Sequence, residues 1–206
     1  MADIEHRSYA MSNVEVRKGE YPTIGGYAAV FERKSVMLYG FREKIMAGAF
    51  QDSLRDDIRA LWQHDTSQVL GRTRSGSLRL WEDDTGLGFE LDPPDTQTGR
   101  DAVTLIIRGD VDQMSFGFNV PVNGDDWSED EDGIPLRIIK RAKLVEVSPV
   151  TFPAYPDTSA GIMRSAPEWV QRALAPDGEN IDRRLNTERA LRAAAYRTRY
   201  LQTLED

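Results

Sequence analysis

Residues 113–120 limit the folds open to this chain more than any other segment. They read Gln-Met-Ser-Phe-Gly-Phe-Asn-Val, so that large apolar side chains alternate with small or polar ones. Successive side chains of a β-strand point to opposite faces of its sheet. The segment therefore predicts a strand with an apolar face that belongs in a core. Its other face is small and polar and leaves room for another group to approach Ser115.

Further strand-like runs predict that most of the chain is β-structure. The runs are residues 24–31, 77–82, 87–91, 136–139 and 144–147. Asp83-Asp84-Thr85-Gly86 joins the second run to the third and is typical of a hairpin turn. Prolines at positions 149, 153 and 156 predict that no regular element continues past the last run.

Two short helices are expected among the strands. Residues 48–58 carry an apolar side chain at every fourth position and predict one helix. These side chains are Phe50, Leu54 and Ile58. Thr98 lies three residues before Asp101, as in a capping box, and predicts a second helix that Gly109 ends.

Composition divides the chain of 206 residues into three parts. Residues 1–20 are polar and aperiodic and predict a flexible arm. Residues 21–160 contain the strand-like runs and predict one folded domain. Residues 161–206 predict a linker and then a long helix from Asp182 to Leu204, rich in Arg, Ala, Leu and Glu. The apolar stripe of that helix is thin, so we expect the tail to bind a partner or to be removed.

Several classes of protein are disfavoured by composition. The chain has no cysteine, which excludes disulfides, a thiolate nucleophile and a cysteine-based zinc site. Its net charge of −8 gives no basic footprint for nucleic acid. No apolar run approaches the roughly 18 residues that cross a membrane, and the N-terminus has no apolar stretch of the secretory kind. We therefore expect a cytoplasmic protein.

Acidic residues concentrate at positions 125–132, where six of eight side chains are carboxylates. A calcium-binding loop has alternating ligands, a central glycine and a terminal glutamate, and this spacing is different. We therefore interpret the segment as a solvated hairpin loop without a metal.

Three residues could together carry acid–base and nucleophilic chemistry. His64 is one of only two histidines, and it stands where an apolar run gives way to a polar loop. Ser115 lies on the polar face of its strand, and Glu146 lies between two valines and so points away from both. A serine nucleophile needs a base, and the base needs a third group to orient it. Each residue alone also fits an ordinary structural role.

Five stretches in this order resemble motifs of a known family. They are residues 26–31, 45–50 with 53–54, 61–65 with 69–71, 114–118, and 144–150 with 153–156. Together they resemble the phage prohead (procapsid) maturation proteases, which are relatives of the herpesvirus assemblins. The resemblance implies a mainly β fold with flanking helices, built as a small closed β-barrel.

The resemblance also implies roles for the site residues. His64 matches the general base and Ser115 the nucleophile. The assemblins use a second histidine as the third member, but this chain has none after His64. Glu146 is our choice, with Asp65 as the fallback, because a residue next to the base often points the wrong way to brace its ring. Backbone N–H groups near Ser115 and Gly117, or the side chain of Arg141, are candidates for holding the oxyanion.

The implied function is a serine endopeptidase without a cofactor or metal. Such enzymes cleave scaffolding protein, or the scaffolding segment of the major capsid protein, inside the procapsid in the cytoplasm of the bacterial host, and often cleave themselves. The expected partners are those two proteins and, as in the assemblins, a second copy of the chain, with neither nucleic acid nor membrane. The rival hypothesis is an inactive β-barrel that acts as a scaffold or shell-assembly factor. A metal hydrolase is disfavoured because there is a single central histidine and no HxxxH-type spacing.

Overall fold

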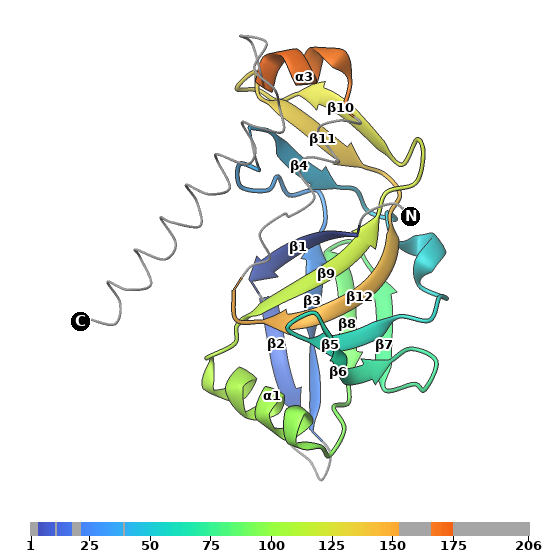
Figure 1. Cartoon of the computed structure of the whole chain (residues 1–206), viewed down its shortest axis with the longest axis vertical. Helices are drawn as coiled ribbons and strands as arrows, with labels where there is room; N and C mark the ends of the chain where they lie inside the picture. Colours follow the sequence, from blue (N-terminus) through green and yellow to red (C-terminus); the bar gives the residue numbers. More distant parts are fainter. Residues whose placement is uncertain (1–3, 11, 18–21, 39, 153–165, 175–206) are drawn as a thin grey trace, which may run out of the picture.

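The computed structural model describes residues 4–10, 12–17, 22–38, 40–152 and 166–174. Over these residues the chain is mainly β, as predicted (Figure 1). The strands are β1 (Glu5–Ala10), β2 (Ser12–Arg17), β3 (Thr23–Val30), β4 (Arg42–Ile45), β5 (Arg59–Trp62), β6 (Asp65–Arg72), β7 (Leu78–Glu82), β8 (Gly86–Leu91), β9 (Gln113–Asn119), β10 (Asp125–Glu129), β11 (Pro135–Ile139) and β12 (Lys143–Val150). The helices are the 3-10 turn η1 (Gln51–Ser53), α1 (Gln97–Arg108) and α3 (Glu168–Leu174).

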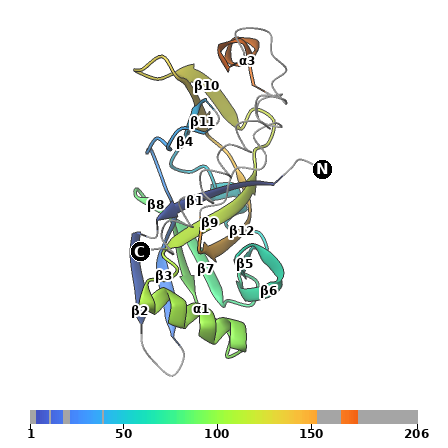
Figure 2. The same ribbon diagram turned by 60° about the vertical axis from the view of Figure 1, so that its left-hand side comes forward.

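The strands form three sheets. A five-stranded sheet has the order β1-β9-β12-β5-β6, a four-stranded sheet has the order β2-β3-β8-β7, and a three-stranded sheet has the order β10-β11-β4. Figure 2 shows the three-stranded sheet at one end of the molecule and α1 at the other. Apolar side chains from the five-stranded and four-stranded sheets share one core, so these two sheets pack on each other.

The core confirms the alternation that the sequence predicts for residues 113–120. Met114, Phe116 and Phe118 are completely buried. Phe50 packs edge-to-face on Phe116, with 5.4 Å between the ring centroids, and on Phe118. This aromatic group lies on the opposite face of β9 from the serine, and its packing fixes which way Ser115 points.

The closed barrel implied by the resemblance is not found among the described residues. β1 pairs with β9 along all six of its residues, while β2 pairs with β3 in another sheet. The chain changes sheet again between β6 and β7. Because hydrogen bonding stops at both places, the strands do not close into one ring.

The expected flexible arm over residues 1–20 is also wrong for the part that the structure describes. Residues 5–10 and 12–17 are the strands β1 and β2. β1 carries charged side chains that are nevertheless buried, because they pair with charges far away in sequence. Arg7 donates to both Glu43 carboxylate oxygens at 2.7 and 2.8 Å, and Arg137 donates to Glu5 at 2.7 Å and to Glu43 at 3.1 Å. A polar sequence therefore forms an edge strand whose charged side chains Glu5 and Arg7 are buried.

The helix expected over residues 48–58 is wrong as well. The structure has turns and η1 there, although Phe50 and Ile58 are buried as the spacing suggested. The Ser53 hydroxyl accepts a hydrogen bond from the Leu144 backbone at 3.1 Å. The Thr73 hydroxyl accepts one from the Ile58 backbone at 2.9 Å. These contacts lead the chain into β5 before a second helical turn can form.

The second predicted helix is confirmed as α1, with its end at Gly109, where φ is 80°. Its N-cap is Thr96, whose hydroxyl accepts from the Gly99 backbone at 3.2 Å, rather than Thr98. Thr98 instead donates to Gln68 of β6 at 3.3 Å. The capping role therefore falls two residues earlier than the sequence pattern suggested.

Two further expectations need correction. The acidic segment 125–132 is not all loop, because its first five residues form β10, which pairs with β11. β12 continues through Pro149 to Val150. Proline is tolerated there because β5 pairs with β12 only at Glu146 and Val147, so that its missing N–H breaks no ladder on that side.

Of residues 161–206, the structure describes only residues 166–174. The helix expected from Asp182 to Leu204 and residues 161–165 of the expected linker lie outside the described residues. None of the helices within the described ranges is long and apolar enough to cross a membrane.

Candidate active site

One face of the five-stranded sheet collects the polar side chains of three neighbouring strands. β9 lies between β1 and β12 (Figure 1). Cross-strand partners point to the same face of a sheet. The register pairs Ser115 with Ser8 and Ser148, and pairs Gly117 with His6 and Glu146. These six residues therefore lie side by side on one face, opposite to the aromatic core.

A bulge in β12 determines that Glu146 belongs to this face. Leu144 pairs with Phe118 and Glu146 pairs with Gly117, so that one extra residue, Val145, is inserted between them. Strict alternation from the buried Leu144 would turn Glu146 into the core. The bulge restores the carboxylate to the polar face, a use of bulges that is common next to active sites.

His64 reaches the same face from the turn between β5 and β6. Gln63 and His64 have φ values of 56° and 61°, which is the pattern of a type I′ turn. Gln63 fastens this turn to the end of β12. Its backbone donates to Pro149 at 3.2 Å, and its side chain exchanges hydrogen bonds with Thr151 at 2.8 and 3.1 Å. The turn thus holds the imidazole beside β12.

The structure brings His64 and Glu146 into direct contact. His64 Nδ1 lies 2.7 Å from Glu146 Oε1, and the Ser148 hydroxyl donates to Oε2 of the same carboxylate. Nε2 of His64 is buried and has no hydrogen-bond partner within the described residues. A neutral imidazole that donates from Nδ1 keeps its lone pair on Nε2. The pair therefore presents the basic nitrogen that a general base needs.

Ser115 lies on the same face but is not hydrogen bonded to His64. It is completely buried, and its hydroxyl donates to the backbone carbonyl of Arg7 in β1 at 3.0 Å. Of the three predicted site residues, two are thus in contact, and the third is held by the neighbouring strand.

Two residues of the site were missed in the sequence. His6 Nε2 lies 3.6 Å from Glu146 Oε1, and the rings of His6 and His64 meet edge-to-face with 4.4 Å between their centroids. Nothing in the polar segment around His6 signalled this position. Ser148 did carry a signal, because it stands two residues after Glu146 in a strand and therefore shares its face.

Asp65, the fallback for the third member, and Arg141, a candidate for holding the oxyanion, both lie away from the His64–Glu146 pair. The Asp65 carboxylate accepts hydrogen bonds from the Ser67 hydroxyl, the Ser67 backbone and Gln68, and these lower the pKa of Asp65. It braces its own strand rather than His64. The Arg141 side chain is exposed and donates a long hydrogen bond of 3.5 Å to the Asn123 carbonyl.

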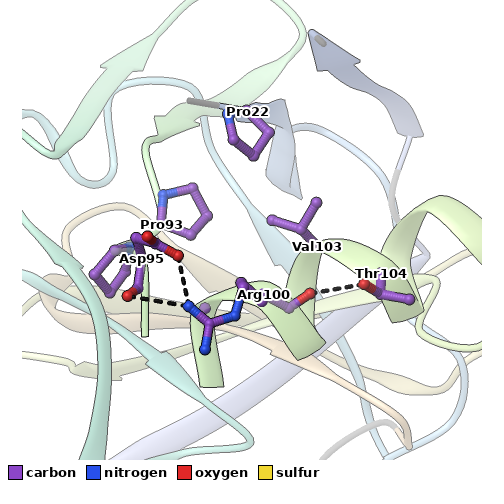
Figure 3. A pocket seen from close by; sticks show the side chains of 8 residues that line it. Pro22, Pro93, Asp95, Arg100, Val103 and Thr104 are labelled. Atoms are coloured by element: carbon purple, nitrogen blue, oxygen red, sulfur yellow. Dashed lines mark hydrogen bonds and ion pairs between the residues drawn. The ribbon is translucent and has the colours of Figure 1, made fainter. Parts of the chain in front are cut away.

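A cavity of about 490 Å³ lies at the start of α1 (Figure 3). Its lining residues are Pro22, Pro93, Pro94, Asp95, Gly99, Arg100, Val103 and Thr104. The Arg100 guanidinium is engaged by Asp95 at 2.6 Å. Because the lining includes none of the predicted site residues, the cavity is not the place of their chemistry.

An imidazole held by a carboxylate, beside a strand that carries a serine, is the set of groups used by serine hydrolases. The family model described as caudovirus prohead serine protease matches residues 7–172. The match covers more than half of the chain, and the chain therefore belongs to this family of serine proteases of phage capsid maturation. No curated protein and no solved structure matches it.

Proposed function

We propose that the chain is a serine endopeptidase that uses Ser115 as nucleophile, His64 as general base and Glu146 as the group that orients the base. Its proposed substrates are the scaffolding protein, or the scaffolding segment of the major capsid protein, and the chain itself. The reaction takes place inside the procapsid in the host cytoplasm. The observation that carries the proposal is the 2.7 Å contact between His64 Nδ1 and Glu146 on the sheet face that bears Ser115.

In this mechanism His64 Nε2 takes the proton of the Ser115 hydroxyl while the oxygen attacks a peptide carbonyl. Glu146 keeps the other ring proton on Nδ1 and stabilises the imidazolium that forms. The imidazolium then protonates the leaving amine, and water hydrolyses the acyl-enzyme by the same steps. Ser148 contributes by holding the second carboxylate oxygen of Glu146.

Ser115 must first give up its hydrogen bond to the Arg7 carbonyl. Rotation about a single staggered bond moves a serine hydroxyl from one partner to another. The carbonyl belongs to β1, which is the edge strand next to β9. We therefore propose that the hydroxyl is turned from Arg7 to His64 when a substrate occupies the site.

The decisive experiment is coexpression of the chain with the capsid protein that carries a scaffolding segment, followed by intact-mass spectrometry. Replacing the nucleophile of a serine protease lowers kcat by roughly six orders of magnitude. We therefore expect Ser115→Ala to abolish the cleavage products, while Ser75→Ala, in an exposed turn, leaves them unchanged. Thermal unfolding of both variants checks that the fold is intact. Cleavage that persists in folded Ser115→Ala would refute the assignment.

A second variant distinguishes the two buried serines on this face. Ser148 is the cross-strand partner of Ser115 and touches the same carboxylate as His64. If it only holds Glu146, Ser148→Ala slows cleavage without abolishing it. Complete loss in Ser148→Ala, combined with activity in Ser115→Ala, would make Ser148 the nucleophile. A different result is that the wild-type chain and both variants all stay at full length and bind shells without cleaving them. That result would favour the rival hypothesis of an inactive scaffold.

A further inference from the structure

We propose that His6, His64 and Glu146 form a zinc-binding site, and that zinc bound there reversibly blocks the protease. One ligand atom from each of the three residues lies within 4.8 Å of the others. Two imidazoles and one carboxylate are among the ligand sets that zinc uses in proteins. The sequence offered no histidine spacing for such a site, because its ligands come from β1, from the β5–β6 turn and from β12.

The distances are close to those that zinc requires. Bonds of 2.0–2.2 Å in a tetrahedron place two ligand atoms about 3.4 Å apart. His6 Nε2 lies 3.6 Å from Glu146 Oε1, and His64 Nδ1 lies 2.7 Å from the same oxygen. The second of these distances must lengthen by less than 1 Å, and the ligand nitrogens of the two histidines lie within 4.8 Å of each other. The ion then takes the place of the proton between His64 and Glu146.

The residues around His6, His64 and Glu146 hold these three side chains close together. A Cβ atom on Gly117 would lie 2.8 Å from Glu146 Oε1 and 3.1 Å from His6 Nε2, so the glycine keeps the space between these groups open. The Ser148 hydroxyl fixes the other oxygen of the buried Glu146 carboxylate. Such outer hydrogen bonds orient the ligands of metal sites.

The His6 backbone is fixed as well. Its carbonyl accepts from Arg7 at 2.8 Å, and Arg7 is itself held by the buried Glu43 carboxylate. β1 therefore presents His6 from an anchored backbone, so that little ordering remains for the ion to impose.

Zinc at this place would stop proteolysis through the tautomer of His64. When Nδ1 binds the ion, the neutral ring gives up its proton there and carries one on Nε2 instead, with no net change in charge on the ring. Nε2 then has no lone pair with which to accept the Ser115 proton. The inhibitory part of the inference rests on the proposed function, whereas zinc binding itself does not.

The composition makes binding easy to assign. The chain has two histidines and no cysteine, so an imidazole site for zinc can use only His6 and His64. The experiment uses the full chain without a histidine tag and with Ser115→Ala, which prevents self-cleavage. Zinc is titrated by calorimetry, and the side chains are followed by ¹⁵N NMR of the imidazoles.

We expect one zinc ion per chain and a shift of both imidazole spectra. His6→Ala and, independently, His6→Gln should weaken zinc at least tenfold, whereas Glu168→Gln on the exposed start of α3 should not. Zinc binding that is equally tight without His6, or that shifts only one imidazole, overturns the site.

The inhibition is tested separately with Ser115 intact. We expect zinc to slow cleavage, a chelator to restore it, and magnesium to have no effect. Zinc that binds as described but leaves cleavage unchanged, or that accelerates it, overturns the inhibitory role. If no cleavage occurs under any condition, the proposed protease function fails and so does inhibition, while the binding result in Ser115→Ala stands by itself.

Discussion

At the scale of single residues, Gly117 decides how closely the groups of the site can approach one another. It lies opposite both His6 and Glu146 in the sheet, and its missing side chain leaves the room that the carboxylate occupies. Since Oε1 is the far end of a flexible side chain, added bulk at Gly117 would displace Glu146 rather than break the strand.

Gly117→Ala should therefore lower proteolysis without unfolding the protein. Displacing Glu146 loosens its hydrogen bond to His64, and misplacement of a catalytic group by about 1 Å can cost roughly 100-fold. We expect a fall in kcat/KM of that order on a peptide substrate. Gly25→Ala is the matched control, because its new Cβ meets neighbours only at ordinary distances of 3.6 and 3.8 Å. Equal activity of the two variants would contradict the role given to Gly117.

Glu82 of β7 gives a second prediction at this scale. One of its carboxylate oxygens accepts from the Phe50 backbone at 2.9 Å, and the other is buried without a partner within the described residues. Burial raises the pKa of Glu82, against the opposing effect of the Phe50 hydrogen bond. The folded protein thus holds this proton more tightly than the unfolded chain does. Its contribution to stability is complete below the unfolded pKa of about 4.3 and is lost as the pH rises through the folded value.

Glu82→Gln should consequently raise the melting temperature at pH 7 and have little effect near pH 4. The amide keeps an oxygen for the Phe50 N–H and carries no charge to bury. Calorimetry at several pH values measures the difference, and Asp84→Asn, in the exposed turn of the same hairpin, is the control. A stabilisation that is independent of pH would show that ionisation of Glu82 is not its cause.

At the scale of elements, local patterns predicted what local contacts determine. The alternation of apolar and polar residues predicted β9, the turn residues 83–86 predicted the β7–β8 hairpin, and Gly109 predicted the end of α1. The helix over residues 48–58 failed because Ser53 and Ile58 hydrogen bond to distant segments. The sequence predicted the correct face for Glu146 but not the bulge at Val145 that turns Glu146 to that face. The bulge arises from the pairing of β12 with β9, so the sequence of β12 alone does not predict it.

The β5–β6 turn yields a prediction about how an element positions His64, the proposed base. Gln63→Gly keeps the positive φ of the turn and the backbone hydrogen bond to Pro149, but it removes both side-chain contacts with Thr151. We expect cleavage to slow by roughly tenfold because His64 is held less firmly. The melting temperature should change little, since the contacts are exposed. Thr151→Val, which removes only the hydroxyl, should have a smaller effect in the same direction, and an unchanged rate in both variants would show that the turn holds His64 without them.

At the scale of the whole molecule, a buried group of charges joins the five-stranded sheet to the three-stranded one. Arg7 and Glu5 come from β1, Glu43 from β4 and Arg137 from β11. Burial opposes the charge on Arg137, and the carboxylates of Glu43 and Glu5 outweigh it, so that the pKa of Arg137 is raised. No sequence pattern could predict this group, because its members are far apart in the chain and each looks like a surface residue.

Arg137→Met should destabilise the protein strongly. Removing the Arg137 guanidinium leaves the buried carboxylates of Glu5 and Glu43 with less positive charge beside them. We expect this to lower the free energy of unfolding by about 3–5 kcal/mol. Arg100→Met, which removes an exposed ion pair with Asp95, should cost less than about 1 kcal/mol. Urea unfolding gives both free energies. Similar values for the two variants would show that the buried group does not hold the sheets together.

The pairing of β1 with β9 also has a consequence for the moment at which the proposed active site can form during synthesis of the chain. Glu5 pairs with Phe118 and Ser8 pairs with Ser115, so about half of the polypeptide is translated after β1 and before β9. A chain still attached to the ribosome cannot complete this face until that second strand has emerged from the exit tunnel. The proposed active site therefore cannot form on a copy of the chain in which β9 is still being synthesised.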